Sequence, residues 1–165
     1  IAAKKDIAEL PMVKQFLLME TKLPMLENDA KLNTKSSDVA FVYNYIKALD
    51  DGAVRGEEIN LANSSNPLLQ RWGTQLVGSF TGESELTPEL KQQMLRELNA
   101  TRGNIAAAAK KQADFKIAQI RKIVPGVRAE ALYPVSNELL MLLKQLSAMV
   151  TFSVAVPLGI MLMIE

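Results

Sequence analysis

The sequence predicts an all-α protein: a helical bundle of short helices, with one long helix and a C-terminal hydrophobic helix long enough to be transmembrane. Apolar residues recur at three- and four-residue steps through most of the chain, which is the helical period. One such pattern continues from Pro88 to Val124, and residues 145–164 carry no charge. We therefore expect three parts, namely N-terminal helices with a connector (1–35), a helical module with the long helix (36–124) and a hydrophobic C-terminal segment (125–165).

Composition excludes several classes of protein. The 165 residues include no cysteine and no histidine, which rules out disulfides, zinc sites of the usual ligand types, Ser-His-Asp triads and Cys-His pairs. We predict that the chain is not an enzyme and has no catalytic residue, metal site or cofactor. The formal net charge of +1 gives no global electrostatic reason to bind nucleic acid. Because the chain begins with Ile1, we expect a processed product or part of a longer polypeptide.

The N-terminal region, residues 1–30, is predicted to form one or two short helices. Pro11 is tolerable only near a helix start, and Pro24 is expected to close the region. Residues 27–35 are polar enough to serve as a connector.

The stretch around which the chain is organised runs from residue 38 to residue 58. Ser36 and Ser37 are expected to cap its helix, and Gly52 is expected to end the helix at a positive φ. One helical stripe in this stretch is apolar and faces inward: Val39, Val42, Tyr45, Ile46 and Leu49. A compact charged set follows: Arg55, Glu57 and Glu58.

The next segments also carry clear local signals. Residues 56–63 are expected to form a short helix, and Pro67 suits the first position of another, in which Trp72 anchors the core. Thr87 caps and Pro88 opens the longest helix, which at about 1.5 Å per residue would reach roughly 54 Å. A helix of this length packs either on a sister subunit or on its own chain as a hairpin, and both interpretations stay open.

The second half of the long helix is basic. Its cations are candidates for a DNA-facing wall, because phosphate contacts need only lysine and arginine at loose spacing: Lys110, Lys111, Lys116, Arg121 and Lys122. A solvated helix face is the simpler interpretation and is favoured, since no aromatic residues interleave for base stacking.

The uncharged run 145–164 has about the length that a helix needs to cross a bilayer. Pro157 and Gly159 lie inside it, and both residue types are commoner in membrane helices than in soluble ones. A segment of this kind could be shielded by other subunits and enter a membrane later. The alternative, a buried helix of a large assembly that never meets lipid, is equally open.

Several stretches resemble, in order, a helical module of tailed-bacteriophage virion proteins of the internal DNA-ejection or tape-measure type. The family's helix ends in Leu-Asp-Pro and is followed by Gly or Thr, Ser, small apolar residues and Arg-Glu-Gly-Glu; here residues 45–58 read YIKALDDGAVRGEE. Residues 10–16 are similar to its Pro-x-Val-Lys-x-Phe element, and residues 82–89 to its Gly-x-x-Leu-Thr/Ser-Pro-Glu helix start. Asp51 stands where the family has proline, and Gly56-Glu57 reverses its Glu-Gly order.

The resemblance covers about residues 6–117 and implies a structural role. It implies a virion protein, stored in the tail or internal core, that passes into the host envelope and helps to form a conduit for the genome. The implied partners are copies of itself, other phage tail or core proteins, the host cell membrane and, non-specifically, phage DNA. Within the structural signature we expect Arg55 to bridge Glu57 or Glu58 and so to fix the corner between helices. The signature residues are Asp38, Tyr45, Leu49, Asp50, Gly52, Arg55, Glu57 and Glu58.

Two alternatives to the conduit remain. A tape-measure or tail-tip fragment would fill the tail tube and use its apolar end only for packing. A peptidoglycan hydrolase would need two carboxyls held across a sugar cleft, for which Glu57, Glu58 and Glu83 are the candidates. Adjacent Glu57 and Glu58 point in different directions on a helix, so the hydrolase is the remote alternative.

Overall fold

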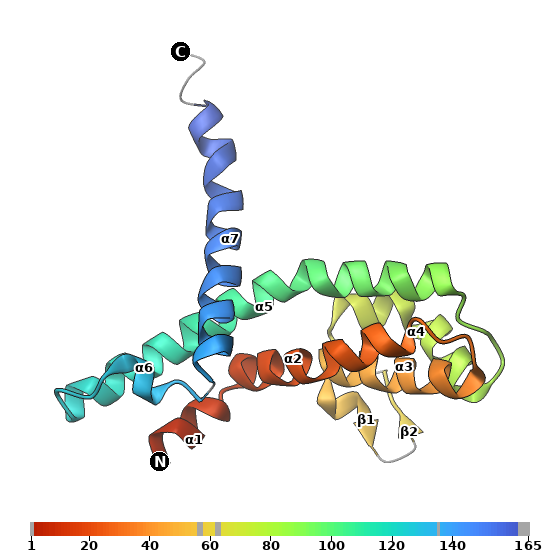
Figure 1. Cartoon of the computed structure of the whole chain (residues 1–165), viewed down its shortest axis with the longest axis horizontal. Coiled ribbons are helices and arrows are strands. Elements are labelled where there is room, and N and C mark those ends of the chain that lie inside the picture. The colour runs from red at the N-terminus through yellow and green to blue at the C-terminus, as the bar shows by residue number, and fades with distance from the viewer. Residues whose placement is uncertain (1, 56–57, 62–63, 135, 162–165) are drawn as a thin grey trace. The chain divides into compact units, whose positions relative to one another are not determined.

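The computed structural model describes residues 2–55, 58–61, 64–134 and 136–161; for Arg55, Glu58, Glu138 and 151–161 it describes the backbone only. This part of the chain is helical apart from one very short hairpin (Figure 1). The helices are α1 (Ala2–Ala8), α2 (Pro11–Asp29), α3 (Lys35–Leu49), α4 (Pro67–Thr81), α5 (Pro88–Ile123), α6 (Ala129–Leu132) and α7 (Asn137–Met161). A 3₁₀ turn, η1 (Asp51–Ala53), and two strands, β1 (Val54–Arg55) and β2 (Glu58–Ile59), lie between α3 and α4. The all-α prediction is confirmed.

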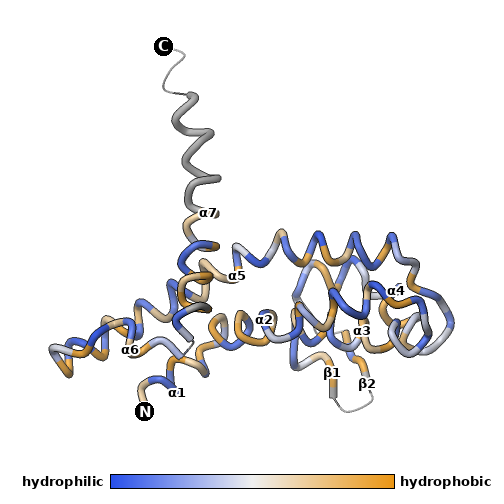
Figure 2. Tube along the Cα trace, viewed as in Figure 1, coloured by the Kyte–Doolittle hydropathy of each residue, from blue (hydrophilic) through white to orange (hydrophobic). Residues whose placement is uncertain are grey.

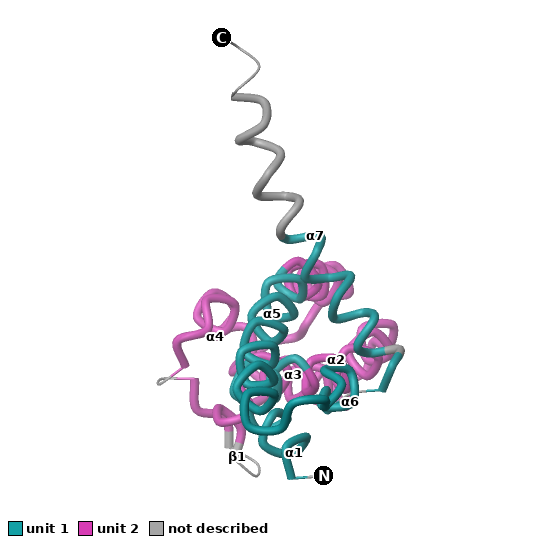
Figure 3. Tube along the Cα trace, turned by 90° about the vertical axis from the view of Figure 1, so that its left-hand side faces the viewer, with its two compact units in different colours: residues 1–16, 101–165 teal, residues 17–100 magenta. Residues whose placement is uncertain are grey.

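The chain divides into two compact units, coloured separately in Figure 3. Unit 1 comprises residues 1–16 and 101–165, and unit 2 comprises residues 17–100. The divisions fall inside α2 and inside α5, whereas the sequence patterns place boundaries at residues 35 and 124. A division inside a continuous helix leaves no local signal in the composition. Sequence patterns therefore do not reveal divisions of this kind.

Unit 2 is built around α3. Side chains on one face of this helix have no exposed surface, and each such burial contributes about 1.5–3 kcal/mol: Phe41, Val42, Tyr45 and Ile46. They are joined in the core by buried residues from the helices around them: Met19 and Leu26 of α2, Leu69 and Leu76 of α4, Met94 and Leu98 of α5. The rings of Phe41 and Tyr45 stack with centroids 5.9 Å apart.

In unit 1, the side chains that α5 contributes to the core are mostly small. The second half of α5 buries a stripe in which alanine predominates: Ile105, Ala106, Ala109, Ala113 and Ile117. Figure 2 shows hydrophobic positions recurring along the α5 tube. A Cβ added at Gly103 would lie 3.1 Å from Val150 Cγ2 and 3.8 Å from the Leu146 carbonyl oxygen. Gly103, which only weakens α5 as an isolated helix, thus allows α7 to approach α5 closely.

Several predicted helix signals are confirmed. Pro11 and Pro67 stand at the first positions of α2 and α4, and the Asn66 side chain accepts a hydrogen bond from Leu68 N. The Thr87 hydroxyl accepts one from Leu90 N at 3.2 Å, where α5 begins. The long helix spans 36 residues and ends at Ile123, immediately before Val124-Pro125-Gly126.

Pro24 does not close the N-terminal region as predicted, because α2 continues through it to Asp29. Proline removes one backbone hydrogen bond from a helix interior. Leu23 and Leu26 are buried on either side of it while Pro24 itself is exposed. Burial of these two leucines offsets the lost hydrogen bond, so core packing outweighs the tendency of proline to end a helix.

The expected helix over 56–63 is wrong. Val54 pairs with Ile59 and Arg55 with Glu58 in an antiparallel hairpin, and Asn60 N donates to the Ala53 carbonyl at 2.9 Å. β-Branched residues at positions 54 and 59 favour strands over helix. Residues 56–57 and 62–63 lie outside the described residues.

The end of α3 also differs from the prediction. Helix α3 ends at Leu49, but Gly52 does not have a positive φ; among the described glycines only Gly82 and Gly126 do. Asp50 instead leaves the helix in an extended conformation, and its Oδ1 accepts a hydrogen bond from Gly52 N at 3.1 Å. A turn stabilised by the Asp50 carboxylate therefore ends α3, in place of a glycine with a positive φ.

Candidate functional site

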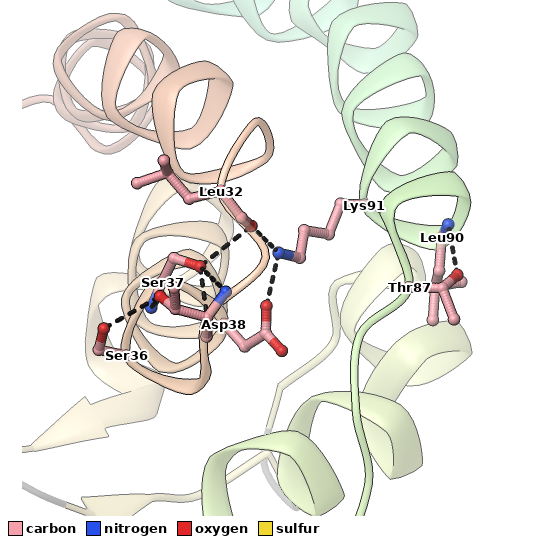
Figure 4. A network of polar contacts seen from close by, with 8 residues as sticks. Leu32, Ser36, Ser37, Asp38, Thr87, Leu90 and Lys91 are labelled. Carbon is pink, nitrogen blue, oxygen red and sulfur yellow. Dashed lines mark hydrogen bonds and ion pairs between the residues drawn. The ribbon is translucent and has the colours of Figure 1, made fainter.

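The start of α3 is joined to the start of α5 by a buried ion pair (Figure 4). Lys91 has no exposed surface, and its Nζ lies 2.5 Å from Asp38 Oδ1. The same ammonium donates a hydrogen bond to the Leu32 carbonyl oxygen at 2.7 Å. Asp38 was predicted as a signature residue, and its position in the structure is a helix corner rather than an open site.

The backbone around this pair is held by a capping box. Thr34, not Ser36, is the N-cap of α3; its Oγ1 accepts from Ser37 N at 3.2 Å, and Ser37 Oγ accepts from Thr34 N at 3.1 Å. Ser37 Oγ also contacts the Leu32 carbonyl oxygen at 3.1 Å. The expected capping by Ser36 and Ser37 is thus corrected, because Ser37 occupies the third helical position.

The energetics of the pair favour a structural role. A buried charge whose partner is removed costs about 3–5 kcal/mol, whereas an exposed pair contributes about 1 kcal/mol or less. The Asp38 side chain is 13% exposed, so the pair belongs to the first class. It fixes the register between two helices.

A second polar cluster surrounds Glu97 of α5. Its Oε2 accepts a hydrogen bond from Trp72 Nε1 at 2.9 Å, and its Oε1 lies 3.3 Å from Arg71 Nη1. The Arg71 guanidinium stands 5.0 Å from the centroid of the Trp72 ring. Trp72 is 8% exposed, so the predicted core anchor also has its polar edge satisfied.

Tyr45, another signature residue, lies fully buried in unit 2. Burial raises the pKa of its hydroxyl well above the ordinary value of 10.0, and the negative charge of Glu97 raises it further. No hydrogen-bond partner of Tyr45 Oη lies within the described residues. The ring therefore contributes to the packing of unit 2.

The remaining signature residues follow α3. Leu49 is 4% exposed, Asp50 forms the turn described above, and Asp51 pairs with Lys47 at 3.5 Å on the surface. The backbones of Arg55 and Glu58 face each other across the hairpin. The expected bridge from Arg55 to Glu57 or Glu58 lies outside the described residues, since their side chains are not described.

The candidate DNA-facing residues do not form a uniform row of free cations. Lys110 Nζ pairs with Asp114 Oδ2 at 2.5 Å, and Asp114 also accepts a hydrogen bond from the Tyr133 hydroxyl. Burial and this bond both raise the pKa of Tyr133. The others lie along the same half of α5, where Lys116 is half-buried and the rest are exposed: Lys111, Lys116, Arg121 and Lys122.

A shallow depression of about 640 Å³ on unit 2 contains Glu83, named above as a hydrolase candidate. Among the described residues that line it, Glu83 alone carries a carboxylate. Glycoside hydrolysis requires a pair of carboxyls, so this surface does not favour the hydrolase. Across the described ranges, no group of three potential metal-ligating side chains occurs.

No sequence motif marks Lys91, the most buried of these polar residues, or Glu97. A signal for Lys91 existed: it precedes Met94 by three residues and Leu98 by seven, so it falls on the apolar stripe of α5. A lysine at such a position requires a buried acid nearby. Its partner could not be identified from sequence, because Asp38 lies on another helix.

Comparison with protein-family models, with curated proteins and with solved structures finds no match to this chain. Within the part of the chain that the structure describes, no helix is both long enough and apolar enough to cross a membrane. The predicted crossing by residues 145–164 thus has no support there. That run includes residues whose side chains, or whose placement altogether, lie outside the description.

Proposed function

We propose that this protein is a structural component of a tailed-bacteriophage particle, stored in the tail or internal core and released during infection. In this proposal several copies assemble, and the C-terminal segment helps to form a conduit for the genome across the host envelope. The resemblance of residues 45–58 to the virion-protein signature is the observation on which it rests. The buried positions of Tyr45 and Leu49 are consistent with it, since a structural signature should anchor a core.

Assembly is supported by exposed apolar side chains of unit 1. On α7, Met141 is 72% exposed and Met149 is 64% exposed, and they lie eight residues apart on one helix face. We propose that these two methionines belong to a surface that other subunits cover, since contiguous exposed apolar patches mark interaction sites.

Dye release from lipid vesicles tests the conduit. The full chain should release dye, and a charge placed in the uncharged run by Val154→Lys should abolish release, because a lysine at the centre of a membrane segment is costly. Gln92→Lys, on the exposed face of α5 in unit 2, is the matched control. Equal release by both variants, or none by the unaltered chain, contradicts the conduit.

The tape-measure role is the second candidate, favoured by the length of α5. Its 36 residues extend roughly 54 Å at about 1.5 Å each, which suits a protein that fills a tube. Copy number in purified particles separates the two roles: three or six copies along the tail axis favour the filler, and a ring of subunits favours the conduit.

A further inference from the structure

The end of α5 and the turn after it form an exposed surface that is both basic and apolar. We call residues 115–128 the basic tip. They contain four cations and no acidic residue: Lys116, Arg121, Lys122 and Arg128. Large apolar side chains are exposed among them, with Phe115 at 68%, Ile123 at 81% and Val124 at 50%. We propose that the basic tip docks onto the surface of an anionic lipid membrane.

The helix geometry places several of these side chains together. Phe115, Gln119 and Lys122 recur at four- and three-residue steps, and all three are exposed. The buried positions of the same segment, Ala113 and Ile117, lie on the opposite face. One face of this half of α5 is thus buried within unit 1, while the other presents a phenylalanine with a lysine two turns further along.

The turn extends this surface beyond the helix end. Helix α5 ends at Ile123, and residues 124–126 are all exposed. Gly126 has a φ of +99°, a conformation that glycine adopts readily, so the chain reverses sharply there. Along the chain, the exposed Ile123, Val124 and Pro125 are flanked by the exposed cations Arg121, Lys122 and Arg128.

The acidic residues next to the tip offset only part of its positive charge. The nearest acids along the chain are Asp114 and Glu130. Asp114 is already occupied by Lys110 and by the Tyr133 hydroxyl, which leaves Glu130 of α6 as the exposed acid next to the tip. Cations near an anionic membrane each strengthen binding about fivefold, within a Debye length of about 8–10 Å.

The apolar side chains favour lipid over the other partners of a basic surface. Nucleic-acid phosphates need cations only, and the tip offers a single aromatic residue for base stacking. A second copy of the tip would bring like charges together. Isoleucine, valine and phenylalanine flanked by cations are the combination with which interfacial segments enter a lipid surface. This inference concerns a site separate from the C-terminal segment and does not rest on the proposed virion role.

Vesicle flotation of the full chain tests the proposal. We expect binding to vesicles containing phosphatidylglycerol, weaker binding to phosphatidylcholine alone, and loss at high salt. The double variants R121E/K122E and I123S/V124S should each weaken binding to the anionic vesicles at least about tenfold. Matched controls from unit 2 are Lys31→Glu and Met25→Ser, which alter an exposed cation and an exposed apolar side chain and should leave binding unchanged.

Site-specific labelling separates the tip from the C-terminal segment, because the chain has no cysteine of its own. An environment-sensitive fluorophore at Pro125→Cys should shift to the blue on anionic vesicles and be quenched by brominated lipid, while one at Met25→Cys should not respond. A response at Met149→Cys alone would refute the tip and leave the conduit standing. A response at Pro125→Cys alone would support the tip and contradict the conduit.

Three further results would overturn the inference. The first is a fluorophore at position 125 that responds equally to both kinds of vesicle. The second is an R121E/K122E variant that loses binding to a short DNA duplex but keeps its binding to vesicles. The third is a tip variant that changes the association of copies with one another and leaves vesicle binding intact.

Discussion

Lys91 Nζ lies 2.5 Å from Asp38 Oδ1, and the lysine side chain has no exposed surface. The pair links the first turn of α3 to the first turns of α5, two elements with no local sequence relationship. The Leu32 carbonyl accepts a hydrogen bond from Lys91 Nζ, and Ser37 of the capping box contacts the same carbonyl. The junction between the starts of α3 and α5 therefore depends on the ion pair between one acidic and one basic residue.

Replacement of either charge alone should strongly destabilise the fold. Lys91→Met leaves the Asp38 carboxylate buried without its partner, so we expect a loss of about 3–5 kcal/mol in the free energy of unfolding. The double variant K91M/D38L should recover much of this loss, because both charges are then absent. Urea unfolding followed by circular dichroism measures the free energy of unfolding of the unaltered chain, of Lys91→Met and of K91M/D38L.

The surface pair Lys47–Asp51 supplies the control for that cycle. Its side chains are 25% and 48% exposed, so Lys47→Met should cost less than about 1 kcal/mol. A loss for Lys91→Met as small as that for Lys47→Met would show that the buried pair does not hold the corner.

Removal of the Tyr45 hydroxyl should not destabilise unit 2. This hydroxyl is buried without a hydrogen-bond partner among the described residues, and leaving a polar group in that state costs about 1–3 kcal/mol. Tyr45→Phe keeps the ring and its stacking on Phe41, so we expect equal or greater stability in urea. A clear loss would mean that the hydroxyl has a partner.

The same residue should contribute to the alkaline limit of stability. Burial raises the pKa of Tyr45 above 10.0, so the folded state holds its proton more tightly than the unfolded state. That stabilising contribution is fully present below pH 10 and is lost as pH rises toward the folded-state pKa, by at most about 1.4 kcal/mol per pH unit. From pH 9 upward, the free energy of unfolding should fall less steeply with pH for Tyr45→Phe than for the unaltered chain.

Gly103 should resist large side chains because α7 lies against it. Its added Cβ would stand 3.1 Å from Val150 Cγ2, so Gly103→Leu must displace α7 and should cost about 1–3 kcal/mol. Gly73 of α4 is the matched control, since its nearest atom, Leu61 Cδ1, is 3.6 Å away. Gly73→Ala should stabilise the protein by up to about 1 kcal/mol. Amide hydrogen exchange of α7 should rise in Gly103→Leu and not in Gly73→Ala.

The parts of the fold that follow local rules could be predicted from the sequence. Pro67 and Pro88 begin helices, and Pro125 follows the last turn of α5, because proline suits a first helical position and cannot continue a helix. Pro24 and residues 56–63 could not be predicted in this way. There, buried leucines and a strand pairing outweigh the local preference.

Only part of the candidate site could be predicted from the sequence. The positions of Tyr45 and Leu49 on the inward stripe of α3 follow from helical spacing, and both are buried. The partner of Asp38 does not follow, since Lys91 is more than fifty positions further along and belongs to a different helix. Pairings across a core depend on how helices pack, which residue spacing within one helix does not encode.

We propose that Met141 and Met149, the exposed methionines of α7, are covered in an assembly. Sedimentation velocity of the purified full chain tests this directly. We expect an oligomer that dissociates when Met141 and Met149 are both replaced by glutamate, while the single controls Met25→Glu and Val77→Glu, at exposed apolar positions of unit 2, leave it intact. A stable, soluble monomer at all concentrations, with residues 140–164 exposed to solvent, would refute the proposed assembly.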